Sequence, residues 1–332
     1  MLFNYFKKKK YKKLIAYAND LYENNKIKEA IDVYEEAFDI IINVNDYIKL
    51  ACIYIDLKEY DKGIKIFNNI LSYYEDDKNN IQGICDVYFG LGVAHDCLRQ
   101  IDKAVYYYEE AIKNGILACE CFYFLACIYD DYNLDKDNEY TIKALTYYKK
   151  AIELNNEYLF AYVNLGTLYS RCGDNDNALK CFLKAKSLDK DNDTNIDYNL
   201  GVAYSTLNDF DNALHYYLEE LKTENPYEAT YYNLGVLYKD NKNYEKAKYY
   251  YLKAIEKNKE EYNAWYNLAC LYALMDDFEN ALDCFTYIKY KKKNLIEAIL
   301  EDPELVSFRS SEYMKKLEEL WFYGRRCIIN KK

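Results

Sequence analysis

The sequence contains few of the residues that break helices. Only 10 glycines and 2 prolines occur among 332 residues, which gives little of the turn chemistry that a many-stranded sheet requires. Hydrophobic residues make up 51% of the chain and charged residues 30%, a mixture that suits amphipathic helices. The composition therefore predicts an all-α fold.

Basic charge is in the minority, and long apolar runs are missing. The formal net charge is −11, and nucleic-acid binding needs a concentrated basic surface, so the composition argues against nucleic acid as the main partner. No apolar stretch reaches the length of a membrane span. The apolar residues at the N-terminus precede the lysines, whereas a secretory signal has the reverse order. We therefore expect a soluble protein without a secretory signal.

Cysteine and histidine do not form the motifs of catalytic or metal sites. The 11 cysteines include no C-x-x-C pair, which is typical of buried free thiols in a reducing compartment. Cys119, Cys121 and Cys127 are close in sequence, but they lack the spacing of a zinc site. His95 stands at a packing position and His215 on an outer helix, and neither has a visible catalytic partner. The sequence therefore predicts a cytoplasmic protein with no catalytic residue, no metal and no cofactor.

The strongest pattern is an internal repeat. Four segments are nearly copies of one another, as in YNLGVAY at 198–204 and YNLGVLY at 232–238. Their small residues recur 34 or 35 positions apart, a period that indicates a helix-turn-helix repeat and is too long for a coiled-coil heptad. These small residues are Gly166, Gly201, Gly235 and Ala269.

Each segment is followed by a second helix in which an alanine precedes an aromatic ring by four residues. Small residues are needed where two helix backbones approach closely, and rings fill the holes beside them. The turns offer Gly or Asn for the left-handed conformation and Asp or Asn to cap the next helix. The turns are 171–175, 207–210, 240–244 and 275–278, and the pairs are Ala178 and Phe182, Ala213 and Tyr217, Ala247 and Tyr251, and Ala281 and Phe285.

The pattern W-x2-L-G-x2-Y followed by A-x3-F/Y-x2-A resembles the signature of the tetratricopeptide repeat family. The resemblance extends into the first half of the chain, for example to Leu91-Gly92 with Ala104 and Tyr108. It implies a right-handed superhelical α-solenoid of tetratricopeptide helix-turn-helix repeats, in which each first helix lines the concave face and each second helix lies outside. The spacing widens between repeats two and three and between repeats four and five, which we interpret as a longer helix or a longer loop. Repeat four carries an extra loop at about 133–139.

We predict three regions in the chain. Residues 1–10 form a basic N-terminal extension, residues 11–295 form eight repeats, and residues 296–332 form capping helices that cover the apolar face of the last repeat. The predicted repeats are approximately 11–43, 44–84, 85–118, 119–158, 159–193, 194–227, 228–261 and 262–295.

The expected cap carries its own sequence signals. Asp302 followed by Pro303 is typical of the start of a helical turn, and Ser310 or Ser311 can cap a final helix. The D-P-x-L-x3-R stretch that ends at Arg309 also resembles what often follows the last repeat in proteins of this family.

An asparagine occupies the same position of the first helix in four successive repeats. This position faces the concave side if the resemblance holds, and an amide can both donate to and accept from one peptide unit. A ladder of amides can therefore hold an extended peptide backbone without reading its side chains. Asparagine is common at this position in the family and frequent in this chain, so a structural role is the alternative. The residues are Asn164, Asn199, Asn233 and Asn267.

Aromatic residues stand one position earlier in several repeats. Exposed rings anchor peptides well, because they bury much area and lose little side-chain freedom. With 42 tyrosines in the chain, many must be structural. The equivalent first-half positions carry no asparagine, so the two halves cannot grip a ligand identically. The candidate aromatic groove residues are Tyr123, Tyr198, Tyr232 and Tyr266.

A run of six lysines lies between Lys7 and Lys13. It can contact an anionic membrane weakly, or nucleic acid, or an acidic protein partner. The alternative is a solvated first helix that covers the exposed end of the solenoid.

These patterns predict a scaffold or adaptor that is not an enzyme. We expect it to bind an extended peptide or a helix of a partner protein in its concave groove. The alternative is a regulatory subunit that docks a catalytic partner through its convex face or its termini. An enzyme in its own right would instead show a buried His or Cys with a strongly shifted pKa in a closed pocket.

Overall fold

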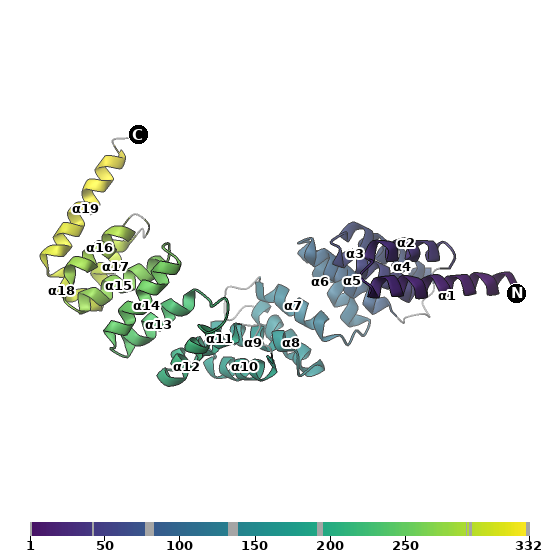
Figure 1. Ribbon diagram of the computed structural model, residues 1–332, viewed down its shortest axis with the longest axis horizontal. Coiled ribbons are helices and arrows are strands. Elements are labelled where there is room, and N and C mark those ends of the chain that lie inside the picture. Colours follow the sequence, from purple (N-terminus) through teal and green to yellow (C-terminus); the bar gives the residue numbers. More distant parts are fainter. Residues whose placement is uncertain are drawn as a thin grey trace. The chain divides into compact units, whose positions relative to one another are not determined.

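The computed structural model describes residues 2–41, 43–76, 83–131, 139–190, 195–289, 291 and 294–329. Within these residues the chain forms helices and no strand, which confirms the predicted all-α fold. The chain divides into two compact units, Met1–Leu165 and Gly166–Lys332, and each consists of helical hairpins (Figure 1). The loop predicted at about 133–139 lies outside the described residues except for Glu139, which begins a helix.

The first unit is built from hairpins of consecutive helices. In it α1 packs on α2, α3 on α4, α5 on α6, and α7 on α8. Helix α4 has 17 residues, so a longer helix, one of the two alternatives expected between repeats two and three, contributes to the wider spacing. The helices are α1 (Leu2–Glu23), α2 (Ile27–Phe38), α3 (Val44–Asp56), α4 (Tyr60–Asp76), α5 (Ile84–Cys97), α6 (Ile101–Lys113), α7 (Cys119–Asp131), α8 (Glu139–Leu154) and the first part of α9 (Leu159–Arg171).

The second unit continues the same pattern. In it α11 packs on α12, α13 on α14, and α15 on α16, while α19 packs on α16. The helices that follow α9 are α10 (Asn175–Leu188), α11 (Ile196–Thr206), α12 (Phe210–Glu220), α13 (Ala229–Asp240), α14 (Tyr244–Lys257), α15 (Tyr262–Leu274), α16 (Phe278–Ile288), α17 (Leu295–Glu301), the 3₁₀ helix η1 (Pro303–Leu305), α18 (Val306–Arg309) and α19 (Glu312–Ile329). The eight repeat boundaries remain a prediction from the sequence.

The small residue of each first helix packs against the ring of its second helix. A Cβ added to Gly235 would lie 2.5 Å from Cε1 of the Tyr251 ring, and one added to Gly92 would lie 2.5 Å from Cδ1 of Tyr108. Real Cβ atoms do not approach a ring this closely, so the helices pack as they do only because these residues lack a side chain. The packing pattern predicted from the sequence is therefore confirmed at these positions.

The residues that cap the second helices were predicted correctly. The residues that take the left-handed conformation in the turns were predicted correctly in only two of the four turns. Gly173 and Asn208 have positive φ angles of 78° and 58°, as expected. In the next two turns Lys242 and Asp276 take this conformation, at 58° and 59°, so the expectation of Asn or Gly there was wrong. The capping residues that accept a backbone N–H of the following helix are Asp174, Asp209, Asn243 and Asp277.

The N-terminal residues belong to the first helix. Residues 2–10 of the predicted extension are part of α1, which continues without a break to Glu23. Tyr11 is the first residue of α1 that is buried among those whose side chains are described. His95 is 6% exposed and stacks on Tyr107 with ring centroids 5.3 Å apart, which confirms its packing role.

The C-terminal segment covers the end of the last hairpin. Leu305 and Phe308 are fully buried, and η1 and α18 pack on α15. Asp302 caps η1 by accepting the N–H of Glu304 at 2.9 Å, and Ser311 accepts the N–H of Tyr313 at 3.2 Å. Of the two serines proposed as the cap of the final helix, Ser311 is therefore the one whose hydroxyl reaches it.

We expect Gly235→Ala to destabilise the hairpin of α13 and α14 by about 2 kcal/mol, because the added methyl group meets the Tyr251 ring. Hydrogen exchange of the amides in these two helices measures the local loss. The reverse change at the equivalent position, Ala269→Gly, should cost only about 1 kcal/mol from helix propensity. If the amides of these two helices exchange at the same rate in Gly235→Ala and in the wild type, the close contact between Gly235 and the Tyr251 ring is contradicted.

Candidate functional site

The eight residues proposed for the peptide-binding groove lie on first helices. Tyr123 is on α7 and Asn164 on α9, while the other six lie in pairs on α11, α13 and α15. All eight side chains are half-buried. The sequence therefore placed them correctly on one set of helices, but it gave no information about which of them touch.

The asparagines bond to tyrosines of the preceding hairpin. Asn233 Nδ2 donates to the Tyr198 hydroxyl at 3.2 Å, and Asn267 Nδ2 donates to the Tyr232 hydroxyl at 3.0 Å. The same bond joins Asn164 to Tyr123 at 3.0 Å in the first unit. We call these three pairs the tyrosine–asparagine ladder: Asn164 with Tyr123, Asn233 with Tyr198, and Asn267 with Tyr232.

The ring of each ladder tyrosine packs against a second tyrosine, which lies on the second helix of the same hairpin. The ring centroids of Tyr198 and Tyr217 are 6.4 Å apart, and those of Tyr232 and Tyr251 are 6.1 Å apart. Tyr217 and Tyr251 are the buried rings that pack against the glycines of the first helices. The packing within one hairpin therefore sets the position of the hydroxyl that meets the next hairpin.

Asn199 differs from the other three asparagines. The position that supplies the tyrosine in the preceding repeat holds Val163, which has no hydroxyl group to accept a hydrogen bond. Asn199 is half-buried on α11 like its counterparts. The repeat before Asn199 therefore supplies no tyrosine hydroxyl at the position that accepts the amide N–H in the other three pairs.

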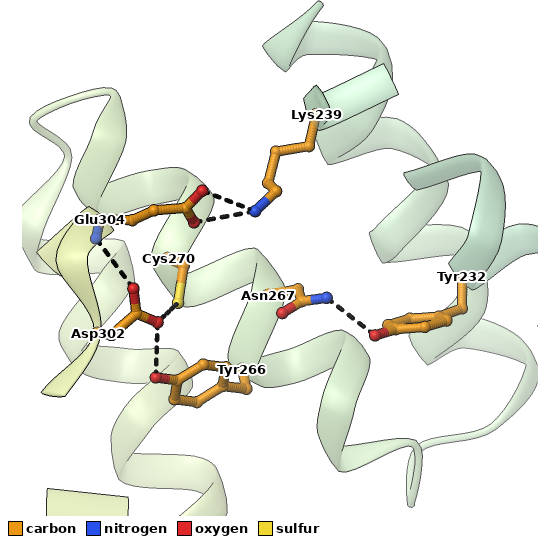
Figure 2. Close-up of polar contacts among 7 residues, drawn as sticks. All are labelled: Tyr232, Lys239, Tyr266, Asn267, Cys270, Asp302 and Glu304. Carbon is orange, nitrogen blue, oxygen red and sulfur yellow. Dashed lines mark hydrogen bonds and ion pairs between the residues drawn. The ribbon is translucent and has the colours of Figure 1, made fainter. Parts of the chain in front are cut away.

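The last tyrosine of the series meets the C-terminal cap. The Tyr266 hydroxyl donates to Asp302 Oδ2 at 2.9 Å, and the Cys270 thiol lies 3.8 Å from the same oxygen (Figure 2). The carboxylate thus takes the place that an asparagine occupies in the other pairs. Both side chains of α15 point toward the segment that enters η1 (Figure 2).

An ion pair connects η1 to α13. Lys239 Nζ donates to both carboxylate oxygens of Glu304 at 2.9 Å (Figure 2). Burial lowers the pKa of Lys239, but the hydrogen bond and charge of Glu304 outweigh it and raise the pKa overall. The lysine therefore stays charged. Arg309 completes the cap by donating to the backbone oxygens of Ile299 and Asp302.

Lys239 and Glu304 were missed by the sequence analysis. They are 65 residues apart, and nothing in the repeat pattern singles out either one. Asp302 carried a usable signal, because the D-P-x-L-x3-R stretch was recognised as typical of the region after a last repeat.

The Tyr266 phenol and the Cys270 thiol of this cluster are hydrogen-bonding groups rather than reactive ones. Burial and the neighbouring Cys270 and Asp302 raise the pKa of Tyr266, so its hydroxyl keeps its proton and donates it to a hydrogen bond. Burial raises the pKa of the Cys270 thiol as well, with Asp302 acting in the same direction. A protonated thiol is a poor nucleophile, so this cluster is suited to holding groups in place.

Histidine, cysteine and acidic side chains also lie outside this cluster. No group of three His, Cys, Asp or Glu side chains among the described residues has the arrangement of a metal site. The cysteines with described side chains are free thiols. Cys52 and Cys97 are exposed, and Cys85, Cys127 and Cys172 are half-buried. The expectation that the cysteines are buried was therefore wrong for these five. None of the described helices is long and apolar enough to cross a membrane.

The chain resembles a known protein family over most of its length. The model of the family described as anaphase promoting complex subunit 8 / Cdc23 matches residues 7–299. No curated protein matches the chain.

Solved structures show the likeness of fold. The type IV pilus biogenesis factor PilW has a TM-score of 0.54 at 14% identity, covering 68% of this chain and 99% of that one. Pseudomonas aeruginosa pilF has a TM-score of 0.53 at 15% identity, covering 70% and 99%. The anaphase-promoting complex hetero-tetramer Cut9–Hcn1 has a TM-score of 0.49 at 17% identity, covering 87% and 55%. The predicted fold, an all-α solenoid of tetratricopeptide repeats, is confirmed.

We expect Asp302→Ala to weaken the C-terminal cap by about 2 kcal/mol, because Tyr266 loses its acceptor and η1 loses its cap. Faster hydrogen exchange of the amides in 295–309 measures this loss. Tyr266→Phe, which removes only the phenol bond, should cost about 1 kcal/mol. Tyr249→Phe makes the same chemical change at a residue that is 55% exposed and should have no effect. If Asp302→Ala exchanges no faster than this control, the proposed role of the contact is wrong.

Stability should fall at alkaline pH because of the buried phenols. Burial raises the pKa of Tyr34 and of Tyr158 from 10.0 to about 12, and raises that of Tyr198 and Tyr232 in the same direction. A folded state with the higher pKa holds the proton more tightly, so this stabilisation is fully present below pH 10 and is lost as the pH rises toward about 12. The midpoint of urea unfolding, measured at increasing pH, reports the loss of stability, and the absorbance of tyrosinate reports the ionisation of the phenols. If all tyrosines ionise near their ordinary pKa and the stability does not change, the predicted loss of stability at alkaline pH is wrong.

Proposed function

Because the chain belongs to the family of anaphase-promoting complex subunit 8 (Cdc23), we propose that it is a non-catalytic scaffold subunit that holds other proteins in a multiprotein assembly. The fold supports this role, since repeated hairpins give a long surface made of many similar positions. The free thiols support a reducing compartment such as the cytoplasm.

We further propose that a partner segment binds in extended form along the first helices of repeats five to eight. The observation that carries this proposal is the tyrosine–asparagine ladder. Asn233 and Asn267 use Nδ2 for the ladder bond, and the carbonyl oxygen of an asparagine amide can in addition accept the N–H of a peptide unit. Amides already fixed by a tyrosine lose little freedom on binding, which favours affinity.

The cap gives an internal example of this kind of binding. Asp302, at the junction of α17 and η1, and Glu304, within η1, lie against α15 and α13, where their carboxylates bond to Tyr266 and Lys239 (Figure 2). The same helix faces are therefore chemically suited to hold the polar side chains of a segment. This resemblance supports the proposal that a partner's segment binds further along the first helices.

Replacing Asn199, Asn233 and Asn267 by alanine should abolish capture of a groove-bound partner from a soluble extract of the source cell. Two matched variants separate direct contact from loss of the ladder. Tyr198→Phe with Tyr232→Phe breaks the same ladder bonds but keeps every amide, so the partner should be retained, with a lower affinity because the amides are no longer fixed. The single change Asn199→Ala removes an amide without breaking a ladder bond, so it should weaken capture. Circular dichroism must first show that each variant is folded.

A partner that all these variants retain would overturn the groove proposal. It would favour the alternative of a regulatory subunit that docks a catalytic partner through the second helices. Large apolar side chains are exposed on these helices, which is the observation in favour of that alternative. They include Tyr106 on α6, Ile142 on α8, and Tyr249 and Leu252 on α14.

A further inference from the structure

The lysine face of α1 is not used by the function proposed above. Six residues at helical spacing line a hollow of about 500 Å³ on this face, and all six side chains are exposed. We infer that this hollow binds a short acidic segment of a partner protein. The lining residues are Tyr5, Lys8, Lys9, Lys12, Lys13 and Ala16.

The other face of α1 is already occupied by the chain itself. Tyr11, Ala18 and Leu21 are buried in the core of the first unit, and Lys10 forms a salt bridge with Glu36 at 3.0 Å. Among the described residues, no salt bridge involves the four lysines of the hollow. Their positive charge therefore remains concentrated on the side of α1 that faces away from the core.

The spacing of these lysines matches the spacing of carboxylates in an extended segment. Lys8 and Lys12 are one helical turn apart, as are Lys9 and Lys13, which corresponds to about 6 Å along the helix. Alternate side chains of an extended segment are about 7 Å apart. Aspartate or glutamate at alternate positions can therefore meet successive lysines, while the ring of Tyr5 offers apolar area or a hydroxyl donor at one end.

The chain uses the same chemistry internally. Glu304 binds Lys239 through both of its oxygens, and Asp302 accepts from the Tyr266 hydroxyl. A lysine of α13 and a tyrosine of α15 thus hold the carboxylates of an acidic stretch in the second unit. The hollow on α1 presents the same two types of group.

The overall charge favours a short segment over a large polyanion. The chain has a net charge of −11 although residues 7–13 contribute +6, so the rest of the chain carries −17. A membrane surface or a nucleic acid extends far beyond the screening length of about 8 Å and meets this negative charge as well. A short segment seated in the hollow interacts mainly with the lysines.

Fluorescence anisotropy with a labelled peptide of alternating glutamate and serine tests this proposal on the full chain. The peptide should bind the wild type, and the affinity should fall by about tenfold or more when the lysines of the hollow become glutamine. A second variant with the same change in net charge elsewhere in the first unit should keep its affinity. The test variant carries Lys8→Gln, Lys9→Gln, Lys12→Gln and Lys13→Gln, and the control variant carries Lys10→Gln, Lys26→Gln, Lys28→Gln and Lys65→Gln.

Glutamine keeps the helix propensity of lysine, and circular dichroism verifies that both variants are folded. Equal affinity in the test variant and the wild type, or no saturable binding of the peptide, would overturn the proposal. Tighter binding of phosphatidylserine vesicles or of a DNA oligonucleotide than of the peptide would also overturn it, in favour of a membrane or a nucleic acid. The triple change Asn199→Ala, Asn233→Ala and Asn267→Ala should leave peptide binding intact, so failure of the groove proposal would not affect this one.

Discussion

The close contact between a small residue on a first helix and a ring on its second helix determines how each hairpin packs. Gly201 leaves no room for a side chain beside Tyr217, and Gly235 leaves none beside Tyr251. The ring held in this way packs against a tyrosine of its own first helix. That tyrosine then accepts a hydrogen bond from an asparagine of the next hairpin. The polar contact between hairpins therefore depends on the apolar contact within each one.

The end of the series shows why tyrosine suits this position. Along the ladder its hydroxyl accepts a bond from an amide, as Tyr232 does from Asn267, whereas Tyr266 donates to the carboxylate of Asp302. A phenol can act in either way, so one residue type serves both between two hairpins and between a hairpin and the cap. The cap can thus end the solenoid with an acidic residue, and Glu304 gains an ion pair with Lys239 from the same placement.

Two surfaces of different chemistry support the scaffold function. The ladder presents uncharged amides and phenols on the first helices, which suit a peptide backbone of any sequence. The hollow on α1 presents four lysines around Tyr5 and Ala16, which select for acidic side chains. A scaffold subunit that uses both can hold partners by shape and by charge.

The sequence by itself determined the helices, their caps and the residues of the packing contact. These features depend on neighbours within one repeat, as with Asp209 capping α12 or Gly235 packing on Tyr251. Even local signals failed where several residues of a turn compete, since Lys242 rather than an asparagine takes the left-handed conformation. Only the tertiary structure decided the partners of the asparagines and the pairing of Lys239 with Glu304, because these contacts join residues 35 to 65 positions apart. Which distant groups meet is set by how the hairpins pack, and no local pattern records that.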